Sequence, residues 1–577
     1  MFCPQCGADA GDSGRFCPAC GGALEATAES RDASPAQTVG QPSSAAGSRP
    51  WWRGRRALFG VLAVAGLAAG AAIAVSLVLG DAPEDHAVEL VPADVALYAT
   101  VHLDPSLGQK RATKDVLDRA RDAGAGDGSS ESLEDVIGAL VTGSTPADYK
   151  SDIKPYVGDQ IALYQRAGDD EATLLMATED PQASQRAMHR ALKREYPDVY
   201  YRIVNGSYRQ QPYEHVVYRD FEGAPPGAAF TVVDGFVVIG DEEGVRASID
   251  ASSGASLATS EKFEQARGKL SDDVLGFAYF DGKPLEEAAR TDPYATSDEL
   301  VPLELLADVG PVAATLTARD SRLELDLAAG GASGRAGLLQ NPSALLAALP
   351  AEAIGAISLG DFGAPLRETL GRSNARAGEI REAVFDLAEL DADSDVASWL
   401  GQLGAYVAGE DTDTVEGGLV AETRSPRSSD QALDQIESYY SSSYDYGFDD
   451  YVYGSDDGLG FDVVGTNVVQ VRGDEDRVVA GMGAAGFSTY RALDADGGFG
   501  ESEVYRRAAG MLGGYEPFLV IDAPPMQRLL EEATDAYYDE TYVNEVQEWL
   551  STISTVAGGV RRSGDDIHVK LVAEVGG

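Results

Sequence analysis

Residues 92–103 read PADVALYATVHL, and residues 350–361 repeat the pattern as PAEAIGAISLGD. In both segments a proline, an alanine and an acidic residue precede a run in which side chains alternate between two faces. Alternation with a period of two residues is typical of a β-strand. The recurrence predicts that one folding unit occurs twice in this chain.

Further pairs of segments support this duplication. Residues 157–162 (VGDQIA) correspond to 400–405 (LGQLGA), residues 260–266 (SEKFEQA) to 502–508 (SEVYRRA), and the closing strands near 311–327 to those near 557–573. The spacing between matched segments shortens by about fifteen residues after the first pair, which indicates an insertion in the first copy, at the Gly/Ser-rich stretch 123–132. We therefore expect tandem repeats over 88–330 and 341–575.

Each repeat is expected to combine helices with hairpins. Strand alternation is clear in 95–103 and 230–240, where Asp234-Gly235 is a typical two-residue hairpin turn. Helical patterns cover 182–196, 260–269 and 428–440. Because hairpins outnumber βαβ units, the predicted fold class is α+β with mainly antiparallel sheets. We expect two lobes related by a pseudo-twofold axis.

The N-terminal segment 1–23 carries all the cysteines of the chain. Cys3, Cys6, Cys17 and Cys20 form two Cys-x2-Cys pairs, each within the word Cys-Pro-x-Cys-Gly. Two such turns complete a closed tetrahedral site, which predicts a structural Zn²⁺ ribbon without a catalytic position. Iron is the alternative metal for four sulfurs. A disulfide is disfavoured because the segment is expected to face a reducing compartment. The segment resembles the short zinc ribbons that begin many bacterial proteins.

A flexible linker (24–50) and a membrane segment (51–80) are expected next. Residues 57–79 are uncharged and mostly apolar, and a helix of this length, about 35 Å, crosses a bilayer of about 30 Å. Arginines precede it and acids follow it, so the N-terminus is expected in the cytoplasm and the C-terminal region outside the cell membrane. A cleaved signal peptide would be shorter and nearer the N-terminus. Gly66 and Gly70 could support a weak homodimer.

The charge of the chain is strongly acidic. There are 45 Lys+Arg against 94 Asp+Glu, a net charge of −49, and the excess lies after residue 80. Such a surface repels nucleic acid and anionic lipid. We therefore expect unknown protein partners on both sides of the membrane and no nucleic-acid partner.

The Pro92-Ala-Asp94 opening and the segment 156–164 (YVGDQIALY), preceded by a membrane segment, resemble a bacterial envelope family, the domain-of-unknown-function family 3352. The resemblance covers most of 88–575. It implies a secreted or membrane-anchored protein and brings no catalytic residues.

Motifs for catalysis are weak, so no catalytic residue is predicted. Residues 481–486 (GMGAAG) fit GxGxxG, but a dinucleotide site also needs a parallel βαβ unit. Residues 391–402 begin like a calcium loop, but Val396 and Gln402 replace the required Gly and Glu. The histidines are scattered, and GxSxG and P-loop motifs are missing from the sequence.

The two repeats differ most in charge at one pair of Tyr-rich segments. Residues 182–209 are basic and the matching 427–457 are acidic. The simpler interpretation is that exposed charges on a helix end and a hairpin diverged between the repeats without a functional consequence. Our hypothesis is that the segments face each other across the lobes or bind a partner of opposite sign. The candidate interaction residues are Arg186, Arg190, Lys193, Arg194, Tyr200, Tyr201, Tyr444, Tyr446, Asp449, Asp450, Tyr451 and Tyr453.

The sequence thus favours a membrane-anchored extracytoplasmic binding or scaffolding protein of the cell envelope, with a cytoplasmic ribbon that docks a protein and without catalysis. Alternatives are a single-pass transmembrane sensor that signals through the ribbon and an envelope hydrolase. Ligand-dependent dimerisation would indicate the sensor, and a carboxylate-lined cleft with a raised carboxyl pKa would indicate the hydrolase.

Overall fold

A computed structural model describes residues 84–123, 154–169, 172–196, 201–218, 228–291, 310–330, 342–361, 400–409, 414–423, 430, 433–434, 437, 451–454, 460–464, 468–473, 476–482, 493, 497–534 and 551–576. The four cysteines, the linker and the apolar stretch 57–79 lie outside these residues, as does the calcium-like stretch up to residue 399. Within the ranges above, no helix is both long and apolar enough to cross a bilayer. The ribbon and the span therefore stay predictions.

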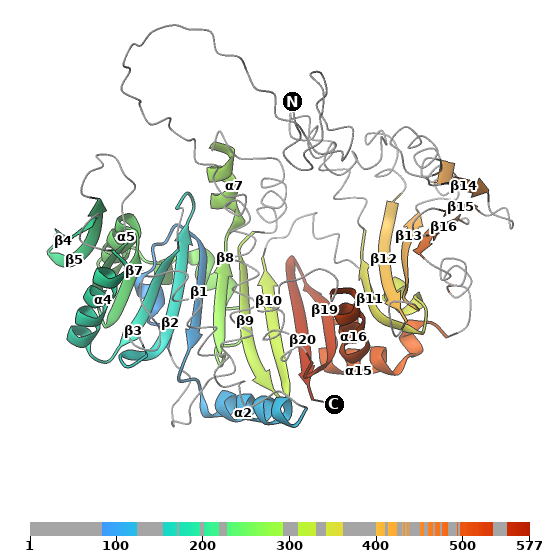
Figure 1. The fold of residues 1–577 in the computed structure, drawn as a ribbon, viewed down its shortest axis with the longest axis horizontal. Coiled ribbons are helices and arrows are strands. Elements are labelled where there is room, and N and C mark those ends of the chain that lie inside the picture. Colours follow the sequence, from blue (N-terminus) through green and yellow to red (C-terminus); the bar gives the residue numbers. More distant parts are fainter. Residues whose placement is uncertain are drawn as a thin grey trace, which may run out of the picture. The chain divides into compact units, whose positions relative to one another are not determined.

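The first half of the described chain alternates strands with short helices (Figure 1). Its elements are η1 (Ala87–Leu90), β1 (Val95–His102), α2 (Leu107–Asp122), β2 (Val157–Arg166), β3 (Thr173–Thr178), α4 (Pro181–Glu195), β4 (Tyr201–Tyr208), β5 (Gln211–Tyr218), β6 (Ala229–Val233), β7 (Phe236–Gly240), α5 (Glu242–Ser252), η3 (Leu257–Thr259), α6 (Glu261–Arg267), β8 (Gly276–Phe280), α7 (Gly282–Thr291), β9 (Val312–Arg319) and β10 (Arg322–Ala329).

The second half follows a similar succession. Its elements are α9 (Ser343–Ala348), β11 (Ala353–Leu359), β12 (Leu400–Ala408), β13 (Glu416–Thr423), β14 (Tyr451–Gly454), β15 (Gly460–Val464), β16 (Val468–Gly473), β17 (Arg477–Met482), η6 (Phe499–Glu501), α15 (Glu503–Leu512), β18 (Glu516–Asp522), α16 (Ala523–Thr534), β19 (Ile553–Ser563) and β20 (Asp566–Val575).

All these strands belong to one 20-stranded antiparallel sheet, which confirms the α+β class. The first half pairs in the order β4-β5-β6-β7-β3-β2-β1-β8-β9-β10. The second pairs in the order β14-β15-β16-β17-β13-β12-β11-β18-β19-β20. Strand for strand, the two orders have the same pattern.

The two halves meet where β10 pairs with β20, from Arg322 opposite Glu574 to Ala329 opposite Ile567. The sequence led us to expect separate lobes, whereas the structure has one continuous sheet. The reason is that the closing strand of each half is an edge strand, and an unpaired edge is stabilised by pairing with another strand. Helix α2 packs against β9 and β20 beside this junction (Figure 1).

The central strands of the first half, such as β3 and β7, are buried on both faces. Along β3, Leu174 and Met176 join one core cluster with residues of α2 and α4, whereas Leu175 joins a second cluster with residues of η1, α5 and α6. Continuous apolar runs such as TLLMAT are typical of strands covered on two sides. The central part of this half of the sheet therefore lies between two layers of helices.

The predicted hairpin in 230–240 and the predicted helix over 182–196 are confirmed, the hairpin as β6 and β7 and the helix as α4 (Pro181–Glu195). Asp234 and Gly235 have φ of 46° and 81°, the left-handed conformation that a two-residue hairpin requires. Helix α4 begins where Asp180 accepts a hydrogen bond from the Ala183 N–H at 2.9 Å, with Pro181 in its first turn.

Candidate interaction surfaces

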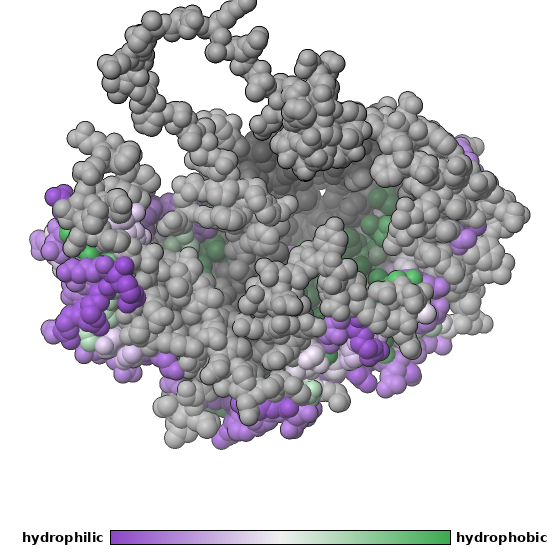
Figure 2. All heavy atoms as spheres, viewed as in Figure 1, coloured by the Kyte–Doolittle hydropathy of each residue, from purple (hydrophilic) through white to green (hydrophobic). Residues whose placement is uncertain are grey.

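Helix α4 has an exposed basic face. Ala187, Met188, Ala191 and Leu192 are buried against the sheet, where the helix packs on β6 and β7. Since residues four and seven apart share one side of a helix, the opposite side gathers a set of exposed cations. These are Arg186, Arg190, Lys193 and Arg194. Figure 2 shows hydrophilic side chains at the left of the view, where Figure 1 places α4.

Most cations of this face have no acidic partner among the described residues. In the part of the chain that the structure describes, Arg186, Arg190 and Lys193 form no hydrogen bond or ion pair. His189 instead points to β5, where its Nδ1 lies 2.5 Å from an oxygen of Glu214. That contact fixes the helix against the sheet, and the three free cations remain on the surface.

The structure places few of the predicted tyrosines. Tyr201 begins β4, half-buried, with its ring 5.1 Å from that of Tyr196 in an edge-to-face contact. Tyr451 and Tyr453 lie in the edge strand β14, and the structure does not describe their side chains. Tyr200, Tyr444, Tyr446, Asp449 and Asp450 lie outside the described residues.

Acidic positions in the second half match the basic face. Asp430, Asp434 and Glu437 are helical and exposed, and they follow β13 as α4 follows β3. Leu433 is half-buried and packs against Gly473 of β16, whereas the three acids are exposed. The spacing of four and seven residues is that of Arg186, Arg190 and Lys193. This shared spacing was visible in the sequence, but the predicted site did not include these acids.

The two charged faces do not adjoin within the sheet. β4 and β14 are at opposite ends of the strand order, because the halves join through β10 and β20. The hypothesis that the two segments face each other across the lobes therefore finds no support in the pairing order. A partner of opposite sign remains the other possibility.

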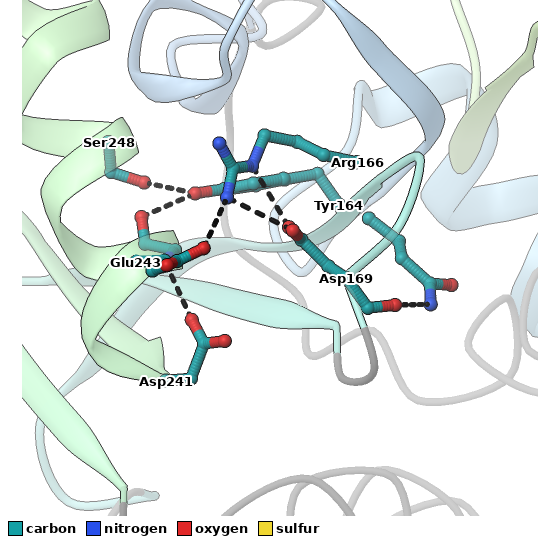
Figure 3. Close-up of polar contacts among 8 residues, drawn as sticks. Tyr164, Arg166, Asp169, Asp241, Glu243 and Ser248 are labelled. Carbon is teal, nitrogen blue, oxygen red and sulfur yellow. Dashed lines mark hydrogen bonds and ion pairs between the residues drawn. The ribbon is translucent and has the colours of Figure 1, made fainter. Parts of the chain in front are cut away.

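A second polar cluster lies between the end of β2 and the start of α5 (Figure 3). Arg166 donates to both carboxylate oxygens of Asp169, at 2.9 and 3.0 Å, and lies 3.7 Å from Glu243. The Tyr164 hydroxyl donates to the Gly244 carbonyl at 2.7 Å and lies 2.9 Å from Ser248. These contacts attach the turn after β2 to helix α5.

The titration of this cluster is consistent with a structural role. Burial raises the pKa of Tyr164 to about 12, so its hydroxyl stays protonated. Burial also raises the pKa of Asp169, while the hydrogen bonds from Arg166 oppose that shift. Since Arg166 occupies both oxygens of Asp169, this carboxyl is not free to act as a general acid or base.

Two motifs weighed in the sequence can be compared with the structure. β17, which precedes the GxGxxG segment, pairs antiparallel with both β13 and β16, unlike the parallel unit of a dinucleotide site. Residues 483–486 lie outside the described part. Across the described residues, no three His, Cys, Asp or Glu side chains converge as metal ligands.

Comparison with solved structures gives only a distant likeness. Crystal form I of TP0453 has a TM-score of 0.21 and 9% identity, over 43% of this chain and 79% of that chain. Crystal form III has a TM-score of 0.21 and 10% identity, over 42% and 78%. Such scores do not establish a shared fold. Comparison with curated proteins gave no significant match.

The family comparison is decisive. Residues 57–449, more than half of the chain, match the family described as "Protein of unknown function (DUF3352)". This match confirms the resemblance that the Pro92-Ala-Asp94 opening indicated. The chain therefore belongs to the DUF3352 family, whose function is unknown.

Proposed function

We propose that this protein is a membrane-anchored envelope scaffold without catalysis, whose outer region associates head to tail with other copies of itself. The observation that carries the proposal is the pair of matched helix faces of opposite charge. Arg186, Arg190 and Lys193 form one face, and Asp430, Asp434 and Glu437 form the other.

The position of the two faces favours contact between copies. Because they belong to opposite ends of the strand order, a basic face can meet an acidic face when two copies align end to end. Such a contact uses two different surfaces, so it repeats and produces open chains. The matching spacing lets each cation oppose one acid.

The expected affinity is low for isolated copies. Each exposed ion pair contributes about 0.2–1 kcal/mol, and copies with a net charge of −49 repel each other elsewhere. Confinement on one membrane raises the effective concentration and compensates for weak contacts. A membrane anchor at 57–79 is therefore part of the proposal.

We also propose that the two halves derive from one duplicated unit and that the ribbon docks a cytoplasmic protein. The identical strand order of the halves supports the duplication. The Cys-x2-Cys pairs support the ribbon. Chelation should release one equivalent of zinc per chain, and Cys3→Ser with Cys6→Ser should abolish both the metal and the partner. Release of iron, or a partner retained by that variant, would refute this part.

Zero-length cross-linking with a carbodiimide tests the scaffold. It joins an amine to a carboxylate only when the two are in contact. Full-length copies with light and heavy nitrogen are mixed in lipid vesicles, and mass spectrometry identifies mixed-isotope products. The proposal predicts Lys193 joined to Asp434 or Glu437 of another copy.

Lys114 on α2 supplies the matched control. Its side chain is 57% exposed, so the reagent can reach it, and it belongs to no proposed face. If Lys193 and Lys114 form mixed-isotope products with these acids equally often, or if neither does, the scaffold proposal is wrong.

A further inference from the structure

A cavity of about 560 Å³ opens beside the Pro92-Ala-Asp94 motif. It lies between the start of β1, the first turn of α6, the end of β8 and helix α7. The polar residues that line it are Asp94, Ser260, Glu261, Lys262, Tyr279, Asp281 and Glu287. Its volume is in the range of small-molecule sites.

The wall of the cavity contains a tyrosine whose side chain is almost fully buried. Tyr279 is only 2% exposed, and within the described residues its hydroxyl forms no hydrogen bond. Burial, reinforced by the charge of Asp281, raises its pKa, so the hydroxyl stays protonated. Because Tyr279 lines the cavity, a ligand there can take the place of water as the partner of this hydroxyl.

Beside this hydroxyl, the Asp281 carboxylate is held in place. Asp281 is 4% exposed and accepts hydrogen bonds from Lys262 Nζ at 2.9 Å and from the Lys283 N–H at 3.1 Å. Its orientation is thus fixed before any ligand enters, which lowers the cost of binding.

The remaining acids give the cavity a negative field. Asp94, Glu261 and Glu287 are exposed and have no ion-pair partner among the described residues. Four carboxylates against one lysine leave a net charge of −3, which attracts a cation. No three acids of the described chain converge closely enough to hold a metal ion. Carboxylates that are spread around a cavity with Val95 and Pro284 in its wall suit a larger organic cation.

We propose that this cavity binds a primary ammonium group carried on a short alkyl chain, either as a free amine or as a lysine side chain of a peptide. The Tyr279 hydroxyl accepts a hydrogen bond from the ammonium, and the surrounding carboxylates neutralise its charge. This site is independent of the charged helix faces, so either proposal can fail while the other stands.

Isothermal titration of the full chain in detergent micelles, against empty micelles, tests this site. The probes are pentane-1,5-diamine, the neutral pentane-1,5-diol and the anionic glutarate, which share one carbon chain. The expected result is binding of the diamine with a Kd of about 1 mM or below and no binding of the other two. N-acetyl-lysine amide is compared with the diamine. Tighter binding of the lysine amide would indicate a peptide lysine as the ligand, and tighter binding of the diamine would indicate a free amine; both results support a primary ammonium ligand.

Two conservative variants locate the binding. Tyr279→Phe and Glu287→Gln should each weaken the diamine by about 3–10-fold, the loss of one hydrogen bond or charge contact. Asp522→Asn is the control, because Asp522 is the counterpart of Asp281 in the second half and does not line the cavity. Asp281 follows Phe280, which pairs with Leu97 of β1, and Asp522 follows Ile521, which pairs with Gly355 of β11. An unchanged urea midpoint shows that a variant is folded.

Four outcomes would overturn the proposal. They are equal binding of the diol, no diamine binding at about 10 mM, displacement of the diamine by equimolar Ca²⁺, and equal loss in Asp522→Asn and Glu287→Gln.

Discussion

Lys570 of β20 donates a hydrogen bond to Glu324 of β10, at 2.8 Å, across the junction of the two halves. The side chains are only 14% and 7% exposed, and Asp326 lies 3.2 Å from the same ammonium group. Burial alone would lower the pKa of Lys570, but Glu324 and Asp326 outweigh burial and raise it. A buried lysine between two carboxylates thus links the halves.

Replacing Lys570 should destabilise the sheet. Lys570→Met leaves the nearly buried Glu324 without its partner, which costs about 2–4 kcal/mol of unfolding free energy. Urea unfolding of the full chain in micelles measures the loss. Lys114→Met removes an exposed pair with Asp118 and should change stability by less than about 0.5 kcal/mol. Equal losses in the two variants would show that the junction does not depend on this lysine.

Stability should also depend on His102 at mildly acidic pH. His102 is 2% exposed, and burial lowers its pKa below 6.5. The unfolded chain therefore takes up a proton near pH 6.5 that the folded chain resists, so stability falls as the pH drops below that value. Above it both states are neutral and the effect vanishes.

His102→Gln should reduce the slope of the unfolding free energy against pH by up to about 1.4 kcal/mol per pH unit, which corresponds to the uptake of one proton. Urea midpoints at pH 5 and pH 7 measure the slope. His86→Gln, at a side chain that is 60% exposed, is the control for the substitution itself. A slope that His102→Gln does not reduce would contradict the buried neutral state.

Removing the hydroxyl of Tyr98 should destabilise the fold more than removing the hydroxyl of Tyr164. Tyr98 donates to the carboxylate of Asp85 at 2.6 Å, where the Asp85 side chain is 4% exposed, whereas Tyr164 donates to a backbone carbonyl at 2.7 Å. Bonds to charged groups contribute more, so Tyr98→Phe should cost about 1.5–3 kcal/mol and Tyr164→Phe about 1 kcal/mol. The same urea assay measures both, and a reversed order would contradict the charge-assisted contact.

Local features of this fold follow from the sequence, whereas long-range ones do not. The Asp234-Gly235 turn and helix α4 were predictable because their signals lie within a few neighbouring residues. The pairing of β10 with β20 was not, since nothing in Arg322–Ala329 specifies which distant strand covers its edge. The cavity was missed for the same reason, because Asp94, Tyr279 and Glu287 are brought together only by the sheet.

The interaction surface was predicted in part. The basic residues of α4 were identified from their charge, and the structure places them on one exposed face. The matching acids have the same spacing, but the net charges of the two segments do not reveal it. Only a comparison of the segments position by position does. The structure adds that Asp430, Asp434 and Glu437 are all exposed.

A scaffold and a sensor predict different effects of the diamine. In a scaffold, saturating pentane-1,5-diamine leaves the yield of Lys193 cross-links unchanged, because the cavity and α4 are built from different elements. In a sensor, the ligand changes association, which is how a single span transmits a signal. Carbodiimide reacts with amines, so excess diamine is removed before the reagent is added, and the diol serves as the control. A change of several-fold would favour the sensor.

Exchange of the two charged faces tests the central claim most directly. Arg186→Glu, Arg190→Glu and Lys193→Glu together should abolish association on vesicles, and so should Asp430→Lys, Asp434→Lys and Glu437→Lys together. The chain that carries all six changes has the net charge of the original and two complementary faces again. The account predicts that this exchanged chain recovers association, measured by energy transfer between donor-labelled and acceptor-labelled copies, because the reversals themselves remove the amine or the carboxylates that carbodiimide joins. Two results would contradict the account. One is association that persists when only one of the two faces is reversed. The other is an exchanged chain that does not associate although its urea midpoint is unchanged.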